Sequence, residues 1–183
     1  MATMPNTLPT QSHLMRLDAD LAWRELLDAL DGLDERQAWA LPRMHGTGDL
    51  ATRGSIIEIV QHLAVCKFMY ASSAFHASQY GWDDCFARIR EMGSDWKANL
   101  EYLHEAQGYW MSSWSHMDDD DMVAPRMTNW GAQWPTWRIV STISHHDSYH
   151  AGQVTLLRAV LAPTDTPCPT HADYSLATLD VKF

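Results

Sequence analysis

Two histidines near the C-terminal end of the chain have the spacing of a metal-binding pair. His146 and His150 lie four positions apart in the stretch "SHHDSYHAGQ", residues 144–153. On a helix, residues four apart are about 40° apart around the axis and about 6 Å apart along it, so two such imidazoles can chelate one ion. His145 is turned about 100° away from His146 and is expected to be a neighbour rather than a ligand.

A third ligand must come from another helix, and the candidate is His62 in "SIIEIVQHLAVCKF". Three neutral imidazoles would leave coordination positions open for water or substrate, which is typical of a catalytic rather than a closed structural zinc site. The alternative is that His62, His146 and His150 are packed in the helical core and hydrogen-bonded to each other or to neighbours.

Two further residues near these histidines are candidate catalytic groups. Glu58 can form an S-x-x-E capping box with Ser55 at the start of a helix, and its alternative role is a general base or a supporting carboxylate one turn from His62. Gln153 could hydrogen-bond a ligand or the substrate. We therefore keep Glu58 and Gln153 as candidates beside the three histidines.

Other nearby residues are predicted to have structural roles. Cys66, one turn after His62, is expected to be a small buried hydrophobe, with a thiolate ligand as the alternative. Asp147 and Tyr149 are expected to face solvent or an interface. Three tryptophans in and after a long loop could either wall a substrate pocket or pack in the core, namely Trp130, Trp134 and Trp137.

Hydrophobic periodicity predicts the helices that would position these residues. Four long helices are expected at 12–30, 55–79, 95–114 and 136–161, and short helical turns at 34–39 and 86–92. The run 118–121 is expected to be a solvated helix end, and no stretch alternates long enough to predict a strand. The buried stripe of the first helix is expected to consist of Leu14, Leu17, Leu21, Leu26, Leu27 and Leu30.

Four long amphipathic helices with one long crossover imply an all-α fold, a four-helix bundle. The 183 residues are enough for one domain with a sizeable core. We expect a flexible N-terminal lead at 1–11, the bundle at 12–162, and a C-terminal tail at 163–183 that packs on the bundle.

Composition argues against several classes of partner. Thirteen Lys and Arg against 23 Asp and Glu leave a formal net charge of -10, so we expect neither nucleic acid nor a membrane as a partner. The three cysteines are widely spaced without a CxxC, and no secretory leader is recognised, so a reducing, cytoplasmic location is expected. A small-molecule substrate is the expected partner, and a Trp-rich bundle surface would suit a homodimer.

Two motifs resemble those of the DinB/YfiT-like superfamily of metalloenzymes. Residues 54–63, "GSIIEIVQHL", are similar to the family pattern W-S-I-x-E-I-x-x-H-L, with Gly54 in place of the tryptophan. Residues 146–153 match the pattern H-x-x-x-H-x-G-Q. The two motifs occur in the family's order and on the expected helices, so the resemblance covers roughly residues 12–162.

The resemblance implies a specific fold and chemistry. It implies an up-down-down-up four-helix bundle in which His62, His146 and His150 bind a divalent ion such as zinc or nickel. Relatives include transferases that use low-molecular-weight thiols such as bacillithiol and mycothiol, and a thiol-dependent maleylpyruvate isomerase. We therefore expect thiol S-transfer to a small electrophile, with metal-assisted hydrolysis second and a non-catalytic metal-binding or small-molecule-binding stress protein as the alternative.

Overall fold

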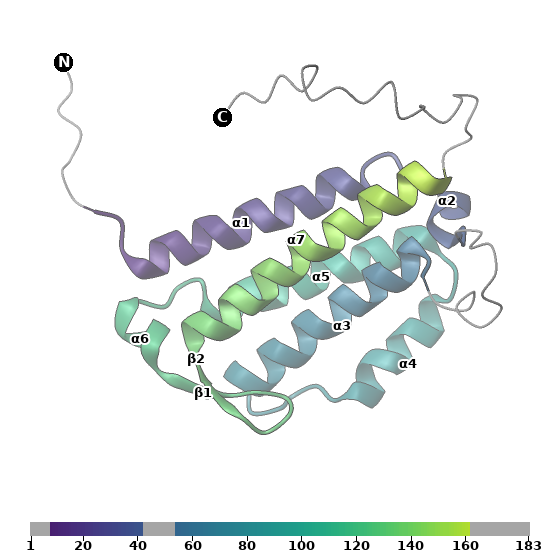
Figure 1. Cartoon of the computed structure of the whole chain (residues 1–183). Helices are drawn as coiled ribbons and strands as arrows, with labels where there is room; N and C mark the ends of the chain where they lie inside the picture. Colours follow the sequence, from purple (N-terminus) through teal and green to yellow (C-terminus); the bar gives the residue numbers. More distant parts are fainter. Residues whose placement is uncertain (1–7, 42–53, 162–183) are drawn as a thin grey trace, which may run out of the picture.

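The computed structural model describes residues 8–41 and 54–161, and this part of the chain is mostly helical (Figure 1). The all-α class is confirmed, apart from one small hairpin. The predicted tail at 163–183 and most of the predicted lead at 1–11 lie outside the described residues. The elements are α1 (Gln11–Leu30), α2 (Glu35–Trp39), α3 (Ile56–Phe75), α4 (Trp82–Met92), α5 (Trp96–Trp114), α6 (Asp119–Val123), β1 (Pro125–Met127), β2 (Gln133–Pro135) and α7 (Thr136–Leu161).

The helix α3 starts where the capping box predicts, but it ends before the predicted residue. Ser55 is the N-cap, and its side chain accepts a hydrogen bond from the backbone N–H of Glu58 in the predicted capping box. The helix ends at Phe75, earlier than the predicted residue 79. Ala77 and Ser78 have φ values of 50° and 60°, and this left-handed backbone cannot continue a right-handed helix.

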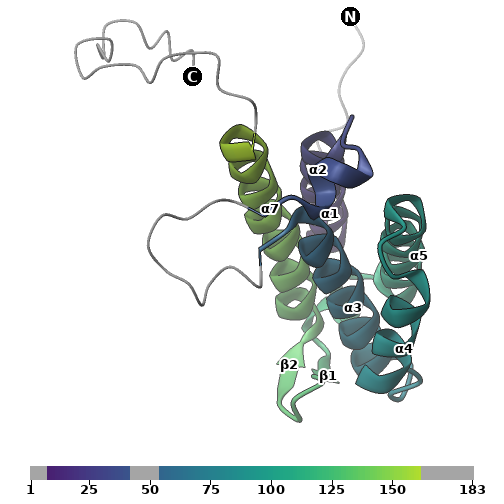
Figure 2. The ribbon, with the colours of Figure 1, turned by 90° about the vertical axis from the view of Figure 1, so that its right-hand side faces the viewer.

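The helices that carry the histidines lie next to each other. α1 packs along α7 and α3 packs along α5, while α3 also contacts α7. In the view of Figure 2, α3 lies between α7 and α5. His62 lies about two turns from the start of α3, and His146 lies near the middle of α7.

The buried face of α1 differs from the predicted leucine stripe. Leu14, Leu17 and Leu21 are exposed, at 50%, 47% and 59% of their surface, so that part of the prediction is wrong. The face toward the core instead carries Ser12, Ala19, Ala22, Leu26, Ala29 and Leu30. Alanines let neighbouring helix backbones approach closely, and a search for large apolar residues gives them too little weight.

Two short helices between the long ones, α4 and α6, were not predicted in full. α4 begins at Trp82, four residues before the predicted turn at 86–92. The acidic run 118–121 is not a solvated helix end: it forms α6, where Asp118 is the N-cap. Asp119 accepts hydrogen bonds from the backbone N–H groups of Gln11 and Ser12, which joins α6 to the start of α1.

The loop before α7 contains an antiparallel hairpin. β1 and β2 pair with Arg126 opposite Trp134, and Gly131 has the positive φ of 83° that its turn requires. Strands of three residues are too short for alternation to be visible in the sequence. Among the helices of the described residues, none is both long and apolar enough to cross a membrane.

Candidate metal centre

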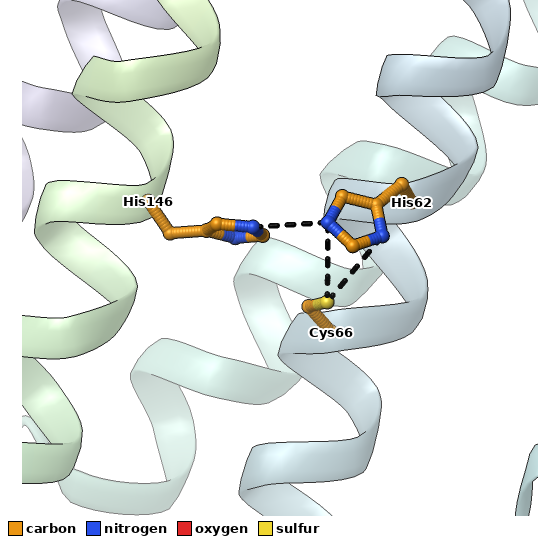
Figure 3. A group of neighbouring side chains, drawn as sticks. All are labelled: His62, Cys66 and His146. Carbon is orange, nitrogen blue, oxygen red and sulfur yellow. Dashed lines mark hydrogen bonds between the residues drawn. The ribbon is translucent and has the colours of Figure 1, made fainter. Parts of the chain in front are cut away.

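Histidines from α3 and α7 point toward each other across the seam between these helices (Figure 3). The Nε2 atom of His146 lies 3.0 Å from Nε2 of His62 and 3.0 Å from Nε2 of His150. The structure thus brings together the three histidines that the sequence singled out. His145, on the same helix, is exposed and stands outside the group, as expected.

Cys66 joins this group from one turn further along α3. Its Sγ atom lies 3.8 Å from both ring nitrogens of His62. Ligand atoms of His62, Cys66 and His146 all lie within 4.8 Å of one another, so these three residues could hold a metal ion. Cys66 is partly exposed rather than buried, so the alternative considered from the sequence, a thiolate ligand, fits its position better than a small buried hydrophobe does.

The donor atoms suit a divalent ion such as zinc. Zinc binds imidazole nitrogen at about 2.0–2.1 Å, so neighbouring nitrogens of a tetrahedral site are roughly 3.3 Å apart. The two observed Nε2 separations of 3.0 Å are close to that value. Imidazole also suits nickel, and the donor types alone do not select between the two metals.

The hydrogen bond of His150 leaves its inner nitrogen ready to act as a ligand. Its Nδ1 lies 2.7 Å from the side-chain oxygen of Gln153, and an amide oxygen can only accept, so Nδ1 carries the proton. Nε2 then holds a lone pair directed at His146. The amide nitrogen of Gln153 donates in turn to the hydroxyl of Tyr149, at 3.0 Å. Such an outer hydrogen bond is the usual support of a metal-binding histidine.

The Gln153→Leu variant should bind zinc about 10- to 100-fold more weakly than the wild type, because leucine fills a similar volume but cannot accept the proton of His150. Chelator competition measures the affinity. Tyr149→Phe is the matched control, since it removes only the outer hydroxyl and should have a smaller effect. Equal affinities for Gln153→Leu and the wild type would show that this amide does not support the site.

Burial keeps the imidazoles of the cluster uncharged. It lowers the pKa of His146 to about 3, and repulsion from His150 and His62 acts in the same direction. Burial likewise lowers the pKa of His62 and of His150. Burial raises the pKa of the Cys66 thiol to about 11. At neutral pH the metal-free site therefore presents three neutral imidazoles and a thiol.

The metal-free protein should lose stability as the pH falls. Histidines of the unfolded chain take up protons near pH 6.5, whereas His146 in the folded protein does so near pH 3. Between these values the unfolded state binds more protons, so protonation favours unfolding. We expect a loss of about 1–2 kcal/mol between about pH 7.5 and about pH 5, measured by urea denaturation. His146→Gln should reduce this dependence, and His145→Gln should not; identical pH dependence in both variants would contradict the assignment.

A buried ion pair ties the two ligand-bearing helices together next to the cluster. Nζ of Lys67 lies 2.5 Å from Oδ2 of Asp147, and their side chains are only 1% and 3% exposed. The Lys67 ammonium also lies 5.4 Å from the centre of the Trp23 ring on α1. Burial lowers the pKa of Lys67 and raises that of Asp147, while their mutual attraction opposes both shifts.

The prediction that Asp147 faces solvent or an interface is wrong. α7 packs against both α1 and α3, so its buried surface is wider than the single stripe through the histidines. Ser144, Asp147 and Ala151 lie on this second buried side. The available signal was Lys67, a charged residue inside a strongly apolar helix, which requires a buried partner. Tyr149, by contrast, is 64% exposed, as expected.

The side chain of Glu58 is hydrogen-bonded to the residues at the start of α3. Its Oε2 accepts hydrogen bonds from the backbone N–H of Gly54 at 2.8 Å, and from the backbone N–H and hydroxyl of Ser55 at 3.1 and 3.0 Å. This is the capping role considered from the sequence. The residue also lines the same pocket as His62 and His150, so its side chain borders the candidate site.

An open pocket of about 660 Å³ borders the cluster, within the usual size range of roughly 300–1,000 Å³ for small-molecule sites. Its lining includes Ile59, His62 and Val65 of α3, Trp82, Phe86 and Ile89 of α4, and His150 of α7. The aromatic rings of Trp82 and Phe86 are stacked, with centroids 5.9 Å apart. The helix α4 therefore supplies an apolar wall opposite the histidines.

The loop tryptophans are not among the residues that line this pocket. Trp130 packs edge-on against Trp134, with centroids 4.8 Å apart, and against Tyr70. The guanidinium of Arg138 lies 3.9 Å from the centre of the Trp134 ring. Trp130 and Trp134 pack around the hairpin, whereas the aromatic wall of the pocket comes from α4, of which the sequence predicted only the turn at 86–92.

Comparisons with known proteins give no family assignment for this chain. A scan against protein-family models found no match, and a search of curated proteins found none either. The described site therefore consists of His62, Cys66 and His146, whose ligand atoms lie within 4.8 Å of one another, with Nε2 of His150 3.0 Å from that of His146, beside an apolar pocket.

Proposed function

We propose that the chain is a divalent-metal-dependent enzyme that transfers a low-molecular-weight thiol to a small electrophile. The observation that carries the proposal is the convergence of the Nε2 atoms of His62, His146 and His150 at the edge of the pocket. A bound divalent ion would supply the positive charge that lowers the pKa of a thiol or a water molecule and makes it a nucleophile at neutral pH.

The protein's own residues would perform the remaining tasks. His62 and His150 border the pocket, so a reactant held there would be next to the donor atoms. Gln153 holds the proton on Nδ1 of His150 and thereby fixes the ring orientation. The apolar wall from Trp82 and Phe86 would bind the carbon skeleton of the electrophile and limit the access of water.

We also propose that the chain belongs with the DinB/YfiT-like metalloenzymes and has their up-down-down-up bundle. The capping box at Ser55 and Glu58, the placement of His62 on α3 and the pair His146 and His150 on α7 support this assignment. The four long helices α1, α3, α5 and α7 would be the bundle, with α4 and the hairpin as insertions.

The test begins with protein purified without a histidine tag. We expect one zinc or nickel ion per chain, and metal-dependent consumption of bacillithiol, mycothiol or glutathione with chlorodinitrobenzene or an epoxide, or metal-dependent and thiol-dependent isomerisation of maleylpyruvate. His62→Ala should lose both the ion and the turnover, whereas His145→Ala, which changes an exposed histidine outside the group, should keep both. Protein that binds neither added zinc nor added nickel would refute the proposal.

The same assays separate this function from its rivals. A protein that holds the ion tightly but turns over none of the thiol and electrophile pairs would be a metal-binding protein without catalysis. Turnover that needs the ion but no thiol would identify a hydrolase instead. The distinction matters because the convergence of imidazoles is common to all three functions, and only the second reactant differs.

A further inference from the structure

Cys66 is the donor that the proposed function leaves without a task. α3 offers His62 and Cys66 four residues apart, and α7 offers His146 and His150 at the same spacing. Residues at this spacing lie on one helix face, so each helix presents two donors to the other. Between α3 and α7, the ligand atoms of His62, Cys66 and His146 lie within 4.8 Å of one another, and Nε2 of His150 lies 3.0 Å from that of His146.

The position of the sulfur agrees with a tetrahedral site. With zinc bonds of about 2.3 Å to sulfur and about 2.05 Å to nitrogen, the sulfur and nitrogen at two corners of a tetrahedron are roughly 3.6 Å apart. The Sγ atom of Cys66 lies 3.8 Å from Nε2 of His62, which in turn lies 3.0 Å from Nε2 of His146. These three atoms already form one face of such a site.

We infer that Cys66 is the fourth ligand of the resting site and that the substrate thiol reaches the ion by displacing it. This inference rests on the proposed function, since it requires that His62, His146 and His150 bind the ion. It goes further because it assigns the fourth coordination position of the ion, in the absence of substrate, to the sulfur of Cys66. Water would then have no open position on the ion until a substrate thiol displaces Cys66.

The displacement explains a preference for thiols over water. The Cys66 thiolate is a soft ligand, and an incoming sulfur replaces it far more readily than the hard oxygen of water does. One bond from the ion to sulfur forms and one breaks, and the proton of the incoming thiol passes to the Cys66 sulfur. The exchange therefore needs neither an oxidant nor a reductant. Once displaced, the Cys66 thiol remains one helical turn from His62 and can return when the product leaves.

The first measurement asks whether sulfur binds the ion. The full chain is loaded with cobalt(II), and the near-ultraviolet band of cobalt–thiolate charge transfer is recorded without added thiol. We expect the band in the wild type and in Cys85→Ala, which removes a buried cysteine of α4 outside the group. We expect Cys66→Ser to lose the band while it still binds one cobalt ion per chain.

The second measurement asks whether Cys66 and an external thiol compete. Calorimetric titration of the zinc-loaded protein with glutathione should give at least about tenfold tighter binding to Cys66→Ser than to the wild type, because a tethered ligand competes at high effective concentration. Equal thiol affinities would overturn the displacement. Cobalt bound without the thiolate band would overturn ligation by Cys66 and leave the histidine site intact, whereas failure to bind cobalt or zinc at all would overturn the proposed function itself.

Discussion

Replacing Asp147 by alanine should lower the free energy of unfolding of the metal-free protein by about 3–5 kcal/mol. The variant would leave the Lys67 ammonium, whose side chain is 1% exposed, without its partner in the core. An unpaired buried charge is among the most destabilising results of a single substitution. Urea denaturation followed by circular dichroism measures the change.

The control is the double variant Lys67→Met with Asp147→Leu. Apolar residues of similar volume remove both charges together, and such replacements are often neutral or stabilising. We therefore expect its stability to lie within about 1 kcal/mol of the wild type or above it. A cost of less than about 1 kcal/mol for Asp147→Ala would mean that water reaches this part of the α3–α7 seam and that the pair is not truly buried.

Replacing His146 by alanine should weaken zinc binding by more than about 100-fold, beyond the roughly 10- to 100-fold that loss of a supporting hydrogen bond costs. His146 is the central member of the group, since its Nε2 contacts those of both His62 and His150. Without it the remaining two imidazoles come from different helices and no longer chelate as a pair. Equilibrium dialysis against a zinc buffer measures the affinity.

His145→Ala is the matched control, because it removes the adjacent exposed imidazole from the same helix with the same change in helix propensity. It should bind zinc as the wild type does. If the two variants lose affinity equally, the loss comes from α7 as a whole and not from the convergence of the three rings. Circular dichroism of both variants establishes that the helix content is unchanged.

Local patterns in the sequence were sufficient to predict where the long helices lie. Hydrophobic periodicity and the capping box at Ser55 located the long helices, and α7 matches its predicted range of 136–161. The spacing of His146 and His150 was equally local. The ring of His62 could be assigned to the same group only through the family resemblance and helix periodicity, and the structure places it there.

The remaining features depend on which helices become neighbours, and a single helix does not contain that information. Asp147 lies outside the buried stripe of α7 that contains the histidines, and that stripe alone predicts an exposed side chain, whereas α7 is covered by both α1 and α3. The sequence offers a thiolate ligand at Cys66 only as the alternative to a buried hydrophobe, and its place beside His146 depends on how α3 packs against α7. Likewise, Trp82 borders the pocket only because α4 packs next to the start of α3.

The buried ion pair has a further consequence for assembly of the site. Lys67 follows Cys66 directly in the chain, and Asp147 follows His146, so the ion pair and the donor group are consecutive layers of the same seam. A slip of α3 along α7 by one turn, about 5.4 Å, would break both layers at once. A misaligned bundle would therefore leave the charges of Lys67 and Asp147 unpaired in the core, so the ion pair favours the alignment of α3 and α7 that also brings the donor atoms together.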